Sequence, residues 1–352
     1  MNPRIFRVFL ILFCLAIPFS AEAQTPKTSP AKKPDPFDSP DFVKTPKQLQ
    51  AELAAIRKMK IEFSGQLSPG VPAAVAQELK NPVGQKKAIE ELRTLMMYRA
   101  VVGVPYADMT LDRQQTAHAL AAAMLLSKND QLSHAPACPP GFPQDIYQLG
   151  HTGAASSNIH MDTGGKGTAE SVRGYMNDSD PGNIDRLGHR RWCINPSMKT
   201  TGFGEYRNQS AVYSAMWSFD RTRDMTKFDY DFIAFPARGL TPVDFLDADW
   251  AWNVSLNPKK YKLAGRPEDV RVRVTPSEIN PKTAKFKKGP RPMPVDSMNV
   301  SQEGFGIALC VIFRPQGLTL TPGTAFCVEI DGFSDMTGKP CTIQYWVVFI
   351  RR

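Results

Sequence analysis

The chain has 352 residues, a formal net charge of +9 and an isoelectric point of about 9.2. Its basic residues are dispersed, often as doublets at wide intervals such as Lys259-Lys260 and Lys287-Lys288, which is typical of a solvated surface. No nucleic-acid-binding motif accompanies them, so we exclude nucleic acid as a partner and retain contact with an anionic surface.

The first 23 residues have the pattern of a secretory signal peptide. Arg4 and Arg7 precede an apolar run, residues 8–19, which closes on Ala21-Glu22-Ala23, and cleavage is expected before Gln24. An uncleaved membrane anchor is the alternative, but the run is well short of the about 20 residues that a spanning helix needs. No later segment suits a membrane span, so we predict a secreted or periplasmic protein without a transmembrane segment after cleavage.

Residues 24–44 are rich in Pro and Lys, a composition typical of a disordered tether. Residues 45–85 are predicted to be a helical lead-in, because apolar residues recur at helical spacing over 47–59 and again over 73–79. The sequence assigns no role to this lead-in.

Two longer helices are predicted over residues 86–101 and 112–127. The first has apolar residues at helical spacing until Gly103 ends it. The second is rich in alanine, with an N-cap expected near Thr110. It contains His118, which we interpret as a packed or surface histidine rather than a ligand.

Several short motifs follow one another along the next part of the chain. One includes a histidine after the alanine-rich helix, one is a predicted helix with an acidic residue, one a Gly-His-Arg turn before an Asn-Pro break, and one a Gly-aromatic-Gly strand entry. In chain order they are Tyr98-Arg99, Leu132-Ser133-His134, Ser156-Ser157-Asn158-Ile159, Thr168–Asn177 with Glu170, Gly188-His189-Arg190, Asn195-Pro196 and Gly202-Phe203-Gly204. Together they resemble the bacterial CAP (SCP) superfamily of cysteine-rich secretory, antigen-five and pathogenesis-related proteins.

The resemblance implies an α+β fold in which residues 86–225 form a CAP-type α-β-α sandwich. In the family, two histidines far apart in sequence meet in one solvent-filled cleft. The resemblance therefore implies that His134 and His189 share a site in this chain. The other implied cleft residues are Ser157, Asn158 and Glu170.

The chain departs from the family at Ser157, which replaces the glutamate that faces the two histidines in members able to hold a divalent cation. Two imidazoles with a carboxylate make a reasonable zinc site, whereas two imidazoles alone make a weak one. We therefore predict no cofactor, with zinc at His134 and His189 as the alternative to hydrogen-bonded cleft histidines. A replacement carboxylate for zinc would come from one of three residues: Asp162, Glu170 or Glu205.

A serine hydrolase site is a further alternative, with Ser157 as nucleophile and His134 or His189 as base. No Gly-x-Ser-x-Gly motif supports it, and Ser157 lies among small polar residues that are typical of a loop. Residues 178–185 are interpreted as an insertion between the helix that carries Glu170 and the Gly-His-Arg turn.

A strand is predicted over residues 211–219, and beyond residue 225 the sequence consists of strands and turns. Residues 226–352 are predicted to form an all-β immunoglobulin-like or fibronectin-like sandwich, because apolar alternation recurs between turns rich in Pro and Gly. Such a module is a spacer or a binding platform and does not itself name a ligand. The predicted strands are 250–256, 270–274, 307–313, 326–330 and 343–349.

An exported chain meets an oxidising compartment, where cysteines form disulfides. Cys138 and Cys193 each lie four residues after a candidate cleft histidine, so closure of the implied cleft predicts that they pair. Cys327 and Cys341 flank an expected hairpin turn and are the second predicted pair. Cys310 is left as a buried thiol.

We therefore predict an exported, non-catalytic binding or scaffold protein. Its CAP domain would present a His-lined cleft to a lipid, glycan, peptide or cell-wall component. The alternative is an extracellular hydrolase, metal-assisted or serine/histidine-dependent, that acts on peptide or ester substrates.

Overall fold

The computed structural model describes residues 43–164, 170–280 and 285–352, which belong to one compact unit. The predicted signal peptide and the predicted tether up to residue 42 lie outside the described residues. Within the described ranges, no helix has both the length and the apolar character needed to cross a bilayer.

The two helices of the predicted lead-in are present as α1 (Pro46–Lys58) and α2 (Ala73–Glu78). Thr45 begins α1 with a capping box, in which its hydroxyl accepts from the Gln48 amide and the Gln48 side chain accepts from the Thr45 amide. Leu49, Leu53 and Ile56 of α1 are buried, so the lead-in packs onto the rest of the unit.

The two longer helices are confirmed as α3 (Pro82–Val102) and α4 (Arg113–Asn129). The N-cap of α4 is Asp112 rather than Thr110, because the Asp112 carboxylate accepts from the Gln115 amide at 2.8 Å. A further helix that was not predicted, α5 (Gln144–Ala155), packs against α4.

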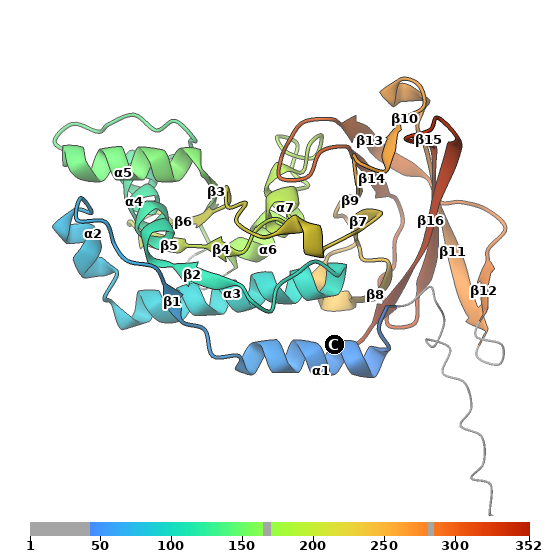
Figure 1. The fold of residues 1–352 in the computed structure, drawn as a ribbon, viewed down its shortest axis with the longest axis horizontal. Helices are drawn as coiled ribbons and strands as arrows, with labels where there is room; N and C mark the ends of the chain where they lie inside the picture. The colour runs from blue at the N-terminus through green and yellow to red at the C-terminus, as the bar shows by residue number, and fades with distance from the viewer. Residues whose placement is uncertain (1–42, 165–169, 281–284) are drawn as a thin grey trace, which may run out of the picture. The chain divides into compact units, whose positions relative to one another are not determined.

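The N-terminal part of the unit extends to residue 225, and the C-terminal part follows it. A three-stranded antiparallel sheet lies between helices in the N-terminal part (Figure 1). Its order is β3 (Ser157–Asp162), β6 (Val212–Trp217) and β5 (Phe203–Arg207). Alternate residues point to opposite faces. One face packs through Ile159 and Ala215 on α4, and the other faces α6 (Ser171–Asn177), where the His160 ring lies against Gly174.

Two short elements complete this part. A small parallel sheet joins β1 (Phe63–Ser64), β2 (Thr110–Asp112) and β4 (Thr200–Thr201). The Gly-His-Arg motif begins the short helix α7 (Gly188–Cys193).

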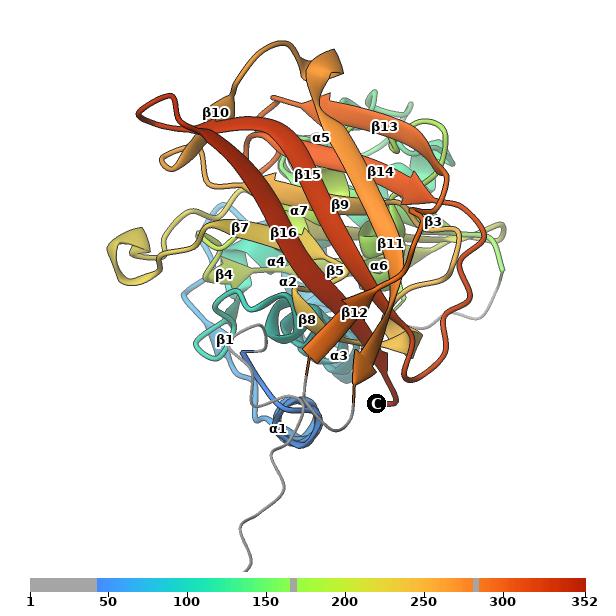
Figure 2. The ribbon, with the colours of Figure 1, turned by 90° about the vertical axis from the view of Figure 1, so that its right-hand side faces the viewer.

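The C-terminal part consists of two sheets, and Figure 2 shows the larger one in front. Its order is β12-β11-β15-β16-β8, with β10 paired to β15, and the smaller sheet has the order β13-β14-β9-β7. The Trp252 ring of the smaller sheet lies 5.7 Å from Phe326 and 6.4 Å from Phe349 of the larger one, so the sheets pack face to face. The strands are β7 (Phe232–Phe235), β8 (Gly239–Pro242), β9 (Trp252–Leu256), β10 (Tyr261–Leu263), β11 (Arg271–Asn280), β12 (Lys285–Lys288), β13 (Val295–Ser301), β14 (Cys310–Pro315), β15 (Ala325–Asp335) and β16 (Pro340–Ile350).

Buried arginines join the N-terminal and C-terminal parts. Arg190 of α7 donates to the carbonyl oxygens of Met176, Asn177 and Ala251 and to Asn253 Oδ1. Burial lowers its pKa to about 10, so the guanidinium remains charged at neutral pH. Because one side chain satisfies acceptors on both parts, α7 is one of the elements that connect them.

The Tyr98-Arg99 motif has a similar structural role. Tyr98 Oη donates to Phe245 O at 3.0 Å, which ties α3 to the C-terminal part. Arg99 is fully buried and donates to backbone carbonyls at the end of α7 and just after it, namely those of Cys193, Asn195 and Met198. These bonds fix the Asn-Pro break behind the Gly-His-Arg motif. The fold is therefore α+β, with both parts sharing one hydrophobic core.

The structure contains neither predicted disulfide, and all five described cysteines are free thiols. Cys327 is opposite Trp346 in the β15–β16 ladder, whereas Cys341 is opposite Phe333. Cys341 and Trp346 are five residues apart along β16, a separation of about 17 Å at the usual rise of a strand. A disulfide needs Cα atoms within about 7 Å, so Cys327 and Cys341 do not pair.

The first predicted pair is also absent. Cys138 is exposed beside Gln144, whereas Cys193 is fully buried and accepts a hydrogen bond from Asn158. Burial raises the pKa of the Cys193 thiol, which disfavours the reactive thiolate. Cys310 is buried, as predicted.

Candidate functional site

His134 and His189 are brought together in one cavity of about 280 Å³, as the resemblance implied. Their ring centroids are 6.2 Å apart and the rings are inclined by 28°. His134 follows α4, and His189 lies in the first turn of α7. Ser157 and Asn158, at the start of β3, line the same cavity.

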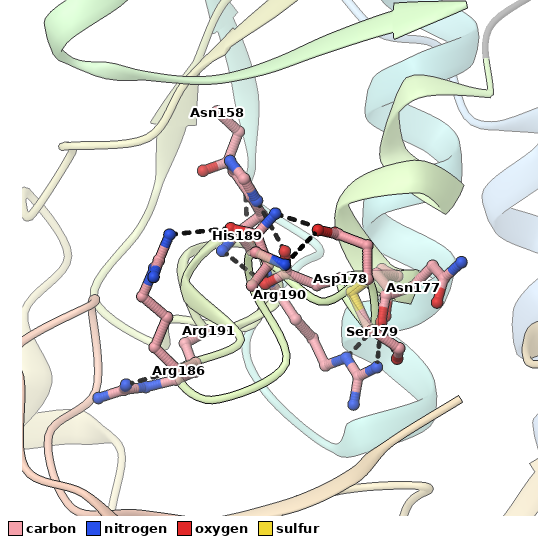
Figure 3. Close-up of polar contacts among 12 residues, drawn as sticks. Asn158, Asn177, Asp178, Ser179, Arg186, His189, Arg190 and Arg191 are labelled. Carbon is pink, nitrogen blue, oxygen red and sulfur yellow. Dashed lines mark hydrogen bonds and ion pairs between the residues drawn. The ribbon is translucent and has the colours of Figure 1, made fainter. Parts of the chain in front are cut away.

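Asp178 holds His189 in place (Figure 3). Its Oδ1 lies 2.7 Å from His189 Nδ1, and its Oδ2 accepts from the His189 backbone amide at 2.9 Å. The Asp178 side chain is 1% exposed, and its backbone has the left-handed conformation (φ 48°) that ends α6. A buried carboxylate that binds one imidazole nitrogen fixes both the ring orientation and the tautomer.

The hydrogen bonds leave the same nitrogen free on both histidines. His134 Nδ1 lies 2.8 Å from Ala154 O, an acceptor without a proton, so Nδ1 must be the donor. His189 Nδ1 likewise donates to the Asp178 carboxylate. In its neutral form each ring therefore keeps a lone pair on Nε2, and the cavity has two imidazole acceptors.

Ser157 and Asn158 differ in their surroundings. Ser157 begins a strand rather than lying in a loop, is buried, and has no hydrogen-bond partner for its hydroxyl. Asn158 donates from its side-chain Nδ2 to His189 O at 2.9 Å, and its backbone amide donates to Ser218 Oγ. Asn158 thus fixes α7 against β3 through its Nδ2 group, which binds His189 O and Cys193 Sγ.

Glu170 does not lie in this cavity, which corrects its inclusion among the cleft residues. It is exposed beside the start of α6 and lines a second cavity of about 250 Å³ with His160 and Asp162. Glu205 forms an ion pair with Lys87 instead. Neither residue replaces the missing glutamate.

The donor set at His134 and His189 is smaller than that of zinc sites. Within the described ranges no group of three or more His, Cys, Asp or Glu residues has a metal-binding arrangement. The Asp178 carboxylate binds His189 Nδ1, where it orients the imidazole and is not a third ligand. Catalytic zinc sites use three protein ligands, so these residues do not fit one and we derive no step through a metal.

Three aromatic side chains line the remaining walls of the cavity, namely Trp192, Phe219 and Phe305. The Trp192 and Phe219 rings are 4.7 Å apart, and Phe219 is 48% exposed. Arg186 also lines the cavity and donates to Asn183 Oδ1 at 3.2 Å. The site therefore combines imidazole acceptors, a guanidinium and an apolar wall.

His118 lies apart from this cavity. Its Nδ1 is 3.2 Å from Leu149 O, and its ring lies 5.1 Å from the Trp217 ring. Burial lowers the pKa of His118. These contacts agree with its interpretation as a packed histidine between α4 and α5.

Among the residues that form the site, Asp178, Arg186, Trp192, Phe219 and Phe305 were not predicted from the sequence. Asp178 belongs to the segment interpreted as an insertion, and its position just after a predicted helix and 11 residues before His189 was the available signal. Phe305 comes from the C-terminal part, between β13 and β14, and no local pattern connects it to the histidines.

No protein-family model matches this chain, and no curated protein matches it.

Proposed function

We propose that this protein is an exported CAP-type binding or scaffold protein that holds a small ligand in the His134–His189 cleft without converting it. Its fold would be a CAP-type α-β-α sandwich followed by an immunoglobulin-like or fibronectin-like sandwich. The ligand would be a lipid, glycan, peptide or cell-wall component. Secretion or export to the periplasm follows from the signal-peptide pattern of residues 1–23.

The observation that carries this proposal is the composition of the cavity. Two imidazole acceptors in defined tautomers lie beside an aromatic wall, in a volume of about 280 Å³. Ligand sites are typically concave and largely apolar, with a few placed polar groups that orient the ligand. Asp178 and Ala154 orient the two imidazoles before any ligand arrives, which lowers the entropic cost of binding.

The serine hydrolase alternative has less support. A serine nucleophile needs a base within hydrogen-bond reach, and the buried Ser157 hydroxyl bonds to neither imidazole. The Asp178–His189 pair does not distinguish the two functions, because it would orient an imidazole equally well for binding and for catalysis.

The test is ligand binding by the full chain after removal of the signal peptide. Panels of oligosaccharides, lysophospholipids and short peptides would be assayed by intrinsic tryptophan fluorescence, because Trp192 lines the cavity. The His134→Ala/His189→Ala variant should lose binding, whereas His118→Ala, outside the cavity, should retain it. Equal binding by the double variant and the wild type would contradict the proposal.

A further inference from the structure

The loop between β13 and β14 forms one wall of the histidine cleft. Phe305 in this loop lines the cavity together with His134 and His189. At Gly188, the first residue of α7, a Cβ atom would lie 3.0 Å from Phe305 Cδ1. The ring therefore packs against α7 at a position where a larger residue would crowd it.

Arg191 fixes this loop to the helix that carries His189. Its guanidinium lies 5.3 Å from the centroid of the Phe305 ring and donates to the carbonyl oxygens of Glu303 and Ile307. The same side chain donates to Ser301 Oγ at 2.9 Å. Arg191 and His189 both lie in α7, two residues apart. The helix that carries the imidazole therefore also holds Phe305 in place.

The polar groups of the cavity indicate what kind of ligand complements them. His134 and His189 have free Nε2 acceptors, which need donors from the ligand. Arg186 contributes donors, which need acceptors. A hydroxyl is both donor and acceptor, so a ligand rich in hydroxyl groups meets both requirements.

The charges and the aromatic rings narrow the choice further. Arg186 lines the cavity, so a cationic ligand would meet a guanidinium group there. The flat rings suit a ligand with an apolar face. A sugar ring combines an apolar face with hydroxyl groups around its edge.

We propose that the cleft binds a sugar ring of a glycan, and that Phe305 of the C-terminal part is the stacking surface that selects it. This inference rests on the proposed function, since it names the ligand class of the same cleft. The C-terminal part thereby contributes a specificity-determining residue and is more than a spacer.

The experiment uses an oligosaccharide array to choose the best-bound sugar, followed by calorimetric titration of that free sugar. Phe305→Ala and Phe305→Leu should each weaken sugar affinity about tenfold, because both lose the flat ring. Phe305→Tyr, which keeps the ring, should retain the affinity. Met298→Ala, an exposed position on β13, is the matched control and should bind as the wild type does. Thermal unfolding of each variant verifies the fold.

Three results would overturn the inference and leave the proposed function intact. These are sugar binding that depends on the histidines but not on Phe305, full affinity in folded Phe305→Leu, and histidine-dependent binding of lysophospholipid or peptide in place of sugar. Absence of binding to every probe would instead contradict the proposed function itself.

Discussion

Replacing Asp178 by Asn should reverse the hydrogen-bonding polarity of His189 while leaving the fold intact. The Asp178 carboxylate accepts from His189 Nδ1 at 2.7 Å, from the His189 amide at 2.9 Å and from the Arg190 amide at 3.3 Å. In the variant, the amide oxygen retains the two backbone donors and the amide NH₂ faces Nδ1. The ring proton then moves to Nε2, so the cleft loses one acceptor and gains a donor.

The cost of this substitution is modest. Hydrogen bonds to a charged group contribute about 1.5–3 kcal/mol and neutral ones about 0.5–1.5 kcal/mol, so the free energy of unfolding should fall by about 2 kcal/mol. Asn tolerates the left-handed backbone of position 178, where φ is 48°. Asp178→Ala lacks every acceptor and is strained in this conformation, so it should cost clearly more.

Nitrogen-15 NMR of the histidine rings reports which nitrogen carries the proton, and urea unfolding measures the stability. Wild type should have the proton of neutral His189 on Nδ1, and Asp178→Asn should have it on Nε2. His134, held by Ala154 O, should be unchanged in both proteins and is the internal control. A proton that stays on Nδ1 of His189 in the variant would refute the reasoning.

Three further predictions concern burial. Arg190→Met leaves four oxygen acceptors, three of them in buried hydrogen bonds, without their donor, so the free energy of unfolding should fall by about 4 kcal/mol in urea titrations. A fall below 1 kcal/mol, about the net value of a single hydrogen bond, would contradict the connecting role of α7. Burial raises the pKa of Glu91 from 4.5 to about 7, so between these pH values the folded state binds one more proton than the unfolded state. The free energy of unfolding should therefore decrease by about 3 kcal/mol as pH rises through this window. If Glu91→Gln showed the same dependence of stability on pH, another group would be responsible for it. In non-reducing thiol labelling, exposed Cys138 should react quickly whereas Cys193 and Cys310 react only after unfolding; a Cys138–Cys193 peptide would restore the predicted disulfide.

Local sequence patterns located the long helices and part of the strands. Apolar spacing located α3 and α4, and alternation located β9, β11, β14, β15 and β16 of the C-terminal part, whereas β7, β8, β10, β12 and β13 were not predicted. Helix α5 was missed because Gly150 and Gly153 weaken its pattern. The structure explains the second glycine, since a Cβ on Gly153 would lie 2.0 Å from His118 O of α4. Close helix packing thus outweighs the low helix propensity of glycine.

The candidate site was predictable in part. The motif order placed His134 and His189 in one cleft, and the structure brings their rings within 6.2 Å. The partner of His189 was missed because Asp178 acts from a left-handed helix end that has no sequence periodicity. The prediction that Cys327 and Cys341 pair was made from their proximity in the chain. Strand register depends instead on strand pairing and turn geometry, and it places the two cysteines apart.

The His134–His189 cleft is proposed to bind its ligand without converting it. The most direct test incubates the wild type with the bound ligand at stoichiometric concentration, together with ester and peptide libraries, and identifies the recovered molecules by mass spectrometry. We predict histidine-dependent binding with every molecule recovered unchanged. Product formation that His134→Ala or His189→Ala abolishes would contradict the claim and establish the cleft as an enzyme active site.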